Sequence, residues 1–226
     1  MVGIRFDPRW EAVYAAGFSQ RWPWDCVVSF VFRHAPADRP RSEVAICELG
    51  FGTGSNLWFA AREGFRVAGL DGSPTAVAAA RARLAEERLD GDLRVGDFTA
   101  PLPFADASFD LVIDRGALTC AGKSAVRRTI GEIRRILRPG GAFLFSPYSA
   151  DHPAARLGRP IGDGLVTDIP TTGLAGLGAI GFWGEEEVRA AFDEGWRIVS
   201  LSHLVADDLV DPNRSRGEWY AVARRV

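Results

Sequence analysis

The strongest constraint on the fold is an alternation of strand and helix patterns along residues 44–148. Short apolar runs with the length of buried strands are separated by segments whose apolar residues recur at helical spacing. This alternation predicts an α/β fold with a doubly wound, mostly parallel sheet, helices on both faces and a ligand at the carboxyl ends of the strands. The five expected strands are Val44–Leu49, Phe65–Leu70, Leu93–Asp97, Phe109–Asp114 and Ala142–Tyr148.

The flanking segments are expected to complete a single domain. The stretch 149–183 holds seven glycines and three prolines in 35 residues, which is too long for a plain connector and favours a functional loop or an inserted hairpin. After it, a helix and two strands, at 196–205 and 219–225, bring the expected sheet to seven strands. In chain order the domain comprises an N-terminal helical cap (1–41), the sheet core (42–148), the long loop (149–183) and the C-terminal helix and strands (184–226).

Acidic residues and glycines gather where the first three strands end. Glu48–Gly54 directly follows the first strand, and its alternate glycines let the backbone turn tightly and approach a ligand. Asp71 ends the next strand 21 residues beyond Gly50, close to the offset of a carboxylate that accepts from ribose hydroxyls. Asp97 ends the third strand, where it can accept from an adenine amino group beside Phe98. A lone aspartate at a strand end is usually a turn residue. Acidic residues at the ends of three successive strands instead indicate a ligand that contains adenosine.

These residues resemble the class I methyltransferases that use S-adenosylmethionine, over about Val44–Tyr148. The resemblance implies that the Glu48–Gly54 loop holds the methionine end of the cofactor, that Asp71 binds its ribose and that Asp97 binds its adenine. Residues 101–112 are similar to the approach to the fourth strand in that family. The expected cofactor-binding residues are Glu48, Gly50, Phe51, Gly52, Gly54, Asp71, Gly72, Asp97, Phe98 and Asp114.

Two other ligand classes are disfavoured. The fingerprint of an NAD-dependent oxidoreductase, G-x-G-x-x-G, would place its third glycine where this chain has Ser55, and Glu48 would repel a pyrophosphate but can bind an ammonium group. Ser146–Tyr148 is similar to part of the motif of nucleic-acid amino-methylating enzymes. It follows the fifth strand instead of the fourth and lacks the second proline, so a nucleic-acid substrate is a minority hypothesis.

Residues that follow the fourth and fifth expected strands are candidates for contact with the methyl acceptor. Arg115 follows the fourth strand, where it could clamp a carboxylate or phosphate, although it could instead form a surface salt bridge with Asp114. His152 follows the fifth strand at the start of the long loop and is either a site residue or a loop residue. Arg115 and His152 are the two candidate catalytic residues. Aromatic candidates for the acceptor pocket are Tyr14, Trp22, Trp24, Tyr148 and Trp183, for which core packing is an equally good explanation.

Net charge and cysteine content limit the kinds of partner that the chain is expected to bind. With 27 basic and 29 acidic residues the net charge is −2, and the chain lacks the basic surface of a general nucleic-acid binder. The three cysteines follow no zinc-binding pattern, so no metal is expected. No apolar run approaches the roughly 20 residues of a membrane span, and the N-terminus has no apolar stretch of the signal-peptide kind. These features predict a cytoplasmic monomer or homodimer without membrane contact.

The sequence therefore predicts an enzyme that transfers a methyl group from S-adenosylmethionine to N or O of a small metabolite. The transfer is an in-line displacement, which depends mainly on alignment and exclusion of water, and the cap and the long loop are expected to enclose the acceptor. An amine acceptor needs only prior deprotonation, whereas a hydroxyl of high pKa needs a base. Two alternatives stay open: a non-catalytic module that binds S-adenosylmethionine or S-adenosylhomocysteine, and a methyltransferase subunit that needs a partner.

Overall fold

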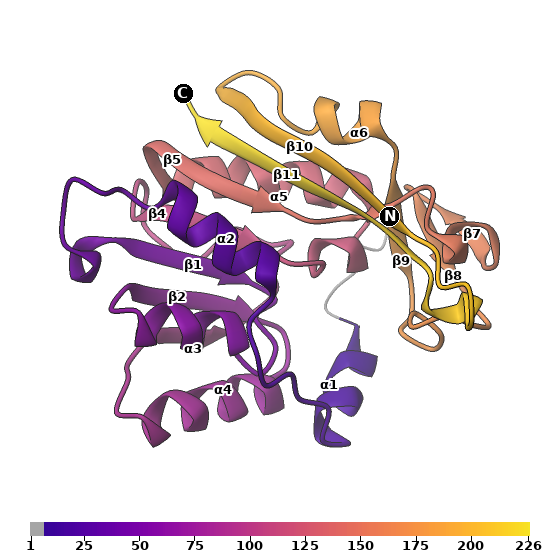
Figure 1. Cartoon of the computed structure of the whole chain (residues 1–226), viewed down its shortest axis with the longest axis horizontal. Coiled ribbons are helices and arrows are strands. Elements are labelled where there is room, and N and C mark those ends of the chain that lie inside the picture. The colour runs from indigo at the N-terminus through magenta and orange to yellow at the C-terminus, as the bar shows by residue number, and fades with distance from the viewer. Residues whose placement is uncertain (1–6) are drawn as a thin grey trace.

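The computed structural model describes residues 7–226 as a curled sheet with helices on both faces (Figure 1). The mixed α/β architecture expected from the sequence is confirmed. The first six residues of the expected cap (1–41) lie outside the described residues, as does most of the N-terminal stretch used for the signal-peptide expectation.

Five parallel strands form the centre of the sheet, in the order β3-β2-β1-β4-β5. All residues of β1 and β4 are buried, which explains why these strands are mostly apolar in the sequence. The order reverses between β1 and β4, so a crevice is expected beyond their carboxyl ends. The central strands are β1 (Ala45–Leu49), β2 (Arg66–Asp71), β3 (Asp92–Val95), β4 (Phe109–Asp114) and β5 (Leu137–Phe145).

Two hydrophobic clusters cover the two faces of this sheet. Helices α2, α3 and α4 contribute to one cluster, and α5 and α6 contribute to the other. Neighbouring strand residues alternate between them, since Ile46 joins the first and Cys47 the second. Within residues 7–226, no helix is both long enough and apolar enough to cross a membrane. The α-helices are α1 (Pro8–Ala15), α2 (Asp25–His34), α3 (Ser55–Arg62), α4 (Pro74–Glu86), α5 (Lys123–Ile136) and α6 (Glu185–Ala190), and the 3-10 helices are η1 (Arg41–Glu43), η2 (Leu118–Cys120), η3 (Pro153–Arg156) and η4 (Pro212–Arg214).

The expected count of seven strands is wrong, because the sheet has 11. All seven expected strands are present, and the last two, β10 (Trp196–Ala206) and β11 (Arg216–Arg225), form an antiparallel pair beside β5. The additional strands come from the segment expected to be a long loop. They are only two to four residues long and lie among glycines and prolines, so they carry no periodic pattern: β6 (Tyr148–Ser149), β7 (Arg159–Gly162), β8 (Leu165–Thr167) and β9 (Ile180–Trp183).

The segment from β6 to β9 is a small folded unit instead of an open loop. β9 pairs with β6 in parallel and with β8 in antiparallel fashion, and β7 completes the unit (Figure 1). Its apolar side chains, including Ile169, Leu174 and Phe182, form a third hydrophobic cluster. The unit is anchored beside Tyr148, so it borders the carboxyl ends of β4 and β5.

Candidate active site

The loop between β1 and α3 forms a backbone cradle. Gly50 and Gly52 have φ values of +66° and +55°, in the left-handed region that favours glycine. A Cβ at Gly50 would come within 2.1 Å of the Ala117 Cβ, and a Cβ at Gly52 within 2.7 Å of the Tyr14 hydroxyl. Any larger residue at these two positions would clash with its neighbours, so both positions require glycine.

Asp71, at the end of β2, holds this loop in place. Its Oδ2 accepts a hydrogen bond of 2.8 Å from Gly52 N–H, and its Oδ1 accepts one of 2.9 Å from Ser73 N–H. Burial raises the pKa of the Asp71 carboxyl, while these two backbone hydrogen bonds act in the opposite direction. The side chain lines the cavity described below, so it both shapes the loop and faces the space where a ribose is expected.

Glu48 places a buried carboxylate at the base of the loop. Its Oε1 accepts a 2.7 Å hydrogen bond from Asn56 Nδ2, whereas its buried Oε2 has no hydrogen-bond partner within residues 7–226. Burial raises the pKa of Glu48 to about 8. A buried carboxylate oxygen without a partner, beside a cavity, fits the ammonium group of a methionine moiety, which would supply both a charge and a donor.

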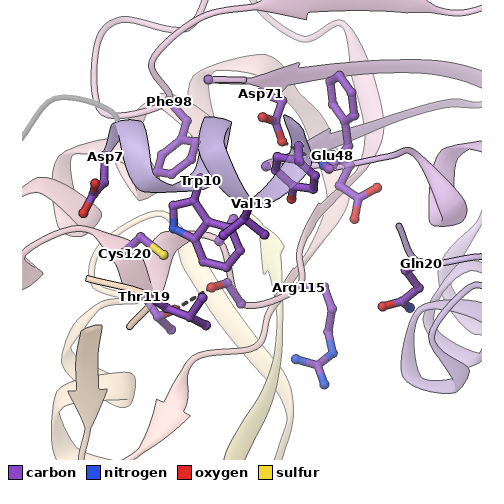
Figure 2. A pocket seen from close by; sticks show the side chains of 18 of the residues that line it. Asp7, Trp10, Val13, Gln20, Glu48, Asp71, Phe98, Arg115, Thr119 and Cys120 are labelled. Atoms are coloured by element: carbon purple, nitrogen blue, oxygen red, sulfur yellow. Dashed lines mark hydrogen bonds between the residues drawn. The ribbon is translucent and has the colours of Figure 1, made fainter. Parts of the chain in front are cut away.

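Asp97 and Phe98 follow β3 at the next corner of the cavity. The Asp97 Oδ1 accepts from the backbone N–H of Thr99 at 2.8 Å and from its hydroxyl at 2.7 Å. This turn fixes the carboxylate, and the Phe98 ring lines the cavity next to it (Figure 2). An acid and an aromatic ring in this arrangement suit an adenine amino group and its ring face.

These elements surround one cavity of about 510 Å³, a size in the range of small-molecule sites. Eight of the ten expected cofactor residues line it: Glu48, Gly50, Phe51, Gly52, Asp71, Gly72, Asp97 and Phe98. Gly54 and Asp114 are not among the lining residues. Gly54 instead forms the N-cap of α3 against Ala80, and Asp114 is fully buried, with its Oδ1 accepting a 2.8 Å hydrogen bond from Leu118 N–H. Burial raises the pKa of Asp114 to about 7.

Helix α1 contributes residues to one side of the cavity (Figure 2). Trp10, Val13 and Tyr14 line it at helical spacing, and the Trp10 indole points into the cavity in Figure 2. Glu11, on the opposite side of the helix, accepts hydrogen bonds from the Ser73 and Thr75 hydroxyls at the start of α4. Helix α1 of the expected cap therefore lines the cavity, with Trp10 and Val13, which were not among the expected residues, beside Tyr14, which was.

The segment between α1 and α2 is hydrogen-bonded to the glycine loop. Gln20 N–H donates to the Thr53 hydroxyl at 3.3 Å, and Trp24 N–H donates to Asn56 Oδ1 at 3.0 Å. Trp24 lines the cavity as predicted. Trp22 does not: it is 62% exposed and packs edge-on against Trp58, with ring centroids 6.2 Å apart.

Arg115 lies in the cavity wall, but its environment differs from both sequence hypotheses. It is buried and pairs with Glu218 of β11, with Nη2 at 3.0 Å and 3.2 Å from the two carboxylate oxygens. The alternative of a surface salt bridge with Asp114 does not describe Arg115, because its carboxylate partner is Glu218. The guanidinium also lies 4.2 Å from the Trp24 ring centroid, so the arginine joins the N-terminal cap to the last strand.

Tyr148 lines the cavity, whereas His152 and Trp183 are not among its lining residues. His152 is buried and caps η3, where its Nδ1 accepts a 3.1 Å hydrogen bond from Ala154 N–H. Trp183 is fully buried and packs edge-on against Phe145 at 5.3 Å. Trp183 is therefore a core residue, which was the alternative explanation for the aromatic candidates. His152 is a loop residue that caps η3.

Sequence reasoning missed a second group of lining residues on the acceptor side. Leu174, Leu177 and Ile180 come from the folded unit between β6 and β9, and Thr119 and Cys120 come from η2 (Figure 2). Their only sequence signal was their place after β4 and β5. Glu218 had no signal, because it lies far along the chain within an ordinary strand pattern. Within residues 7–226, no group of metal-ligating side chains is present.

Comparisons with known proteins agree with this geometry. Residues 46–141 match the family of methyltransferase domains. The chain is 38% identical over 85 residues to a malonyl-[acyl-carrier protein] O-methyltransferase of Coxiella burnetii, covering 38% of this chain and 26% of that protein. It is 39% identical over 85 residues to a dimethylglycine N-methyltransferase of Parasynechococcus marenigrum, covering 37% and 28%. The chain thus spans less than half the length of the curated relatives it matches.

Among solved structures, the fold is similar to a putative methyltransferase of Haloferax volcanii in complex with the Trm112 methyltransferase activator. That match has a TM-score of 0.64 and 25% identity, and covers 96% of this chain and 97% of the other. The glycine cradle, the acids at three strand ends and the match over residues 46–141 point to one cofactor, S-adenosylmethionine. Over residues 46–141 the chain is similar to methyltransferase domains, and its fold is that of a solved S-adenosylmethionine-dependent methyltransferase of Methanosarcina mazei, with a TM-score of 0.71 and 16% identity over 91% of this chain and 99% of the other.

Proposed function

We propose that this chain transfers a methyl group from S-adenosylmethionine to N or O of a small metabolite held in the same cavity. The observation that carries the proposal is the continuity of the cavity. Its wall passes from Glu48 and Asp71 to an acceptor side formed by Trp24, Tyr148 and Leu174. A donor and an acceptor can therefore share one enclosed space.

Different residues of this chain would bind different parts of the cofactor. Glu48 binds the ammonium group, Asp71 accepts from the ribose hydroxyls, and Asp97 accepts from the adenine amino group beside Phe98. S-adenosylmethionine supplies an electrophilic methyl group on a sulfonium. The contribution of the protein is alignment and exclusion of water, which can account for about 7 to 11 kcal/mol of a bimolecular barrier.

A small acceptor is supported by the enclosure of the cavity. Helix α1 covers one side and the unit between β6 and β9 covers another, which leaves about 510 Å³ for both reactants. The relatives described above carry names with an oxygen acceptor on a malonyl group of a carrier protein and with dimethylglycine as a small nitrogen acceptor, so they do not fix the accepting atom. The net charge of −2 is also poorly suited to a polyanionic substrate.

A methyltransferase subunit that needs a partner is the second candidate. It is favoured by the similarity, over nearly the whole chain, to a protein solved with a methyltransferase activator. In that case the isolated chain would bind the cofactor but show little turnover.

A transfer assay separates these candidates. The purified chain is incubated with S-adenosylmethionine carrying a labelled methyl group and with pools of small amines, phenols, alcohols and thiols. Label recovered in a small product supports the proposal. Binding of S-adenosylhomocysteine without any transfer favours the partner-dependent subunit or a non-catalytic module, and absence of binding contradicts all three.

A further inference from the structure

The acceptor side of the cavity contains a buried ion pair that the cofactor-binding residues do not use. Arg115 follows β4, and Glu218 lies in β11, which ends the chain. Their side chains are each only 7% exposed, and both residues line the cavity. Because desolvating two charges is unfavourable, a pair kept at the wall of a cavity needs an explanation beyond stability.

The positive charge of this pair is already neutralised. Arg115 Nη2 donates to both oxygens of Glu218, and the guanidinium lies near the rings of Trp24 and Tyr220, at 4.2 Å and 5.8 Å from their centroids. The other charged residues that line the cavity are carboxylic acids, among them Glu48 and Asp97. An anionic acceptor would therefore meet no free cation on this wall.

The Glu218 carboxylate retains accepting capacity. Its Oε2 accepts from Arg115 at 3.0 Å and from the Tyr220 hydroxyl at 2.5 Å, whereas Oε1 accepts only the longer Arg115 bond of 3.2 Å among the described residues. A carboxylate oxygen can accept more than one hydrogen bond. The hydrogen bonds to Oε2 thus fix the orientation of the carboxylate, while Oε1 accepts one long hydrogen bond and can accept another.

The other titratable groups around Glu218 are poorly suited to receive a proton. Those that interact with it are Arg115, Tyr220, Tyr148, Cys26 and His152. The arginine is a permanent cation. Burial raises the pKa of the Tyr148 phenol to about 12 and also raises the pKa of the Cys26 thiol, so neither forms an anion readily. Burial lowers the pKa of His152, which is not a lining residue and whose Nδ1 is occupied by Ala154.

We infer that Glu218 orients the methyl acceptor by accepting its N–H or O–H proton, and that the acceptor is an apolar molecule with a protic nucleophile and no anionic group beside it. This inference rests on the proposed function. In the step, the lone pair of the acceptor forms a bond to the methyl carbon while the carbon–sulfur bond breaks and leaves its electron pair on sulfur. The acceptor proton passes to Glu218 and then to solvent. Leu174, Leu177 and Ile180 supply the apolar wall.

Three size-matched probes test the acceptor class: 2-phenylethylamine, 2-phenylethanol and phenylacetate. Each is titrated into the chain saturated with S-adenosylhomocysteine, with binding followed by saturation-transfer NMR. The amine and the alcohol are expected to bind at least tenfold more tightly than phenylacetate. In Glu218→Gln, Arg115 loses its counter-charge, so this preference should shrink at least fivefold or reverse. Tighter binding of phenylacetate to the unsubstituted chain, or an unchanged preference in the variant, would overturn the inference.

The role of Glu218 in proton transfer is tested by turnover of any amine or alcohol that the transfer assay identifies. Glu218→Gln is expected to lower kcat at least a hundredfold, while the dissociation constant of S-adenosylhomocysteine stays within threefold. Tyr220→Phe is the matched control, because it removes only the bond to Oε2, and its kcat should fall less than tenfold.

The two failures are distinguishable. Loss of S-adenosylhomocysteine binding by the unsubstituted chain contradicts the proposed function. Retained binding with no affinity for the amine and the alcohol, or an unchanged kcat in Glu218→Gln, contradicts only the inference about Glu218.

Discussion

Glu48→Gln is expected to weaken binding of S-adenosylhomocysteine and to remove most of its dependence on pH between 6 and 8. Glu48 is buried, and its pKa is raised to about 8, so most molecules carry a neutral carboxyl at this position near neutral pH in the free protein. An ammonium group binds the ionised form. Binding should therefore release a proton, and affinity should rise as the ionised fraction of Glu48 rises.

The magnitude follows from the pKa. At pH 7 a group with a pKa of about 8 is roughly one-tenth ionised, so ionising it costs about 1.4 kcal/mol, and at pH 6 the cost is about twice as large. The dissociation constant should therefore fall about tenfold between pH 6 and pH 7 and about fivefold more by pH 8. A hydrogen bond to a charged group contributes about 1.5 to 3 kcal/mol, so Glu48→Gln at pH 8 should bind roughly 10- to 100-fold more weakly.

Calorimetric titration at pH 6, 7 and 8, in two buffers of different ionisation enthalpy, measures both the affinity and the protons released. We expect nearly one proton released at pH 7 by the unsubstituted chain and little by Glu48→Gln. Burial also raises the pKa of Asp71, which lines the cavity, and that of Asp114, to about 7, so a smaller pH dependence can persist in the variant. Equal pH dependence in both proteins would refute the reasoning.

Three further predictions follow from the same geometry. Without ligand, the raised pKa of Glu48 makes its contribution to stability fully present below about pH 4.5 and lost as pH rises through about 8. Glu48→Gln should therefore raise the melting temperature at pH 9 but not at pH 4. Equal shifts in the melting temperature at the two pH values would contradict this. Asp71→Ala removes the acceptor of Gly52 N–H as well as the ribose contact, and should weaken S-adenosylhomocysteine binding in calorimetry by about 1 to 3 kcal/mol; an unchanged constant would exclude this role. Glu11→Ala removes the bonds that hold α1 to α4 and should speed dissociation of the ligand about threefold to tenfold in stopped-flow fluorescence, whereas Trp22→Ala, at an exposed residue outside the cavity, should not.

The central sheet could be predicted because its strands are buried on both faces. A strand such as Phe109–Asp114 is then mostly apolar, and the helices between the strands carry clear signals such as the Ser73 N-cap before Pro74. The position of the candidate cofactor residues beside the cavity could be predicted for the same reason, since Glu48, Asp71 and Asp97 each lie near a strand end.

The acceptor side could not be predicted, because tertiary contacts decide it. Strands of two to four residues between β6 and β9 are held by pairing and a small apolar cluster, neither of which produces a periodic pattern. Arg115 and Glu218 are 103 residues apart, and only the placement of β11 beside β5 and β6 brings them together. His152 and Trp183 border the segment between β6 and β9 in the sequence, as expected, but their side chains pack locally. The direction of a side chain cannot be read from its position in the sequence.

The most direct test of the account is calorimetric titration of the purified chain with S-adenosylhomocysteine and, in parallel, with NADH. The acids and glycine cradle around the cavity predict that S-adenosylhomocysteine binds at one site per chain and that NADH does not bind. Binding of NADH without S-adenosylhomocysteine would contradict the account, because a cavity that accepts a pyrophosphate next to Glu48 is not the site argued above.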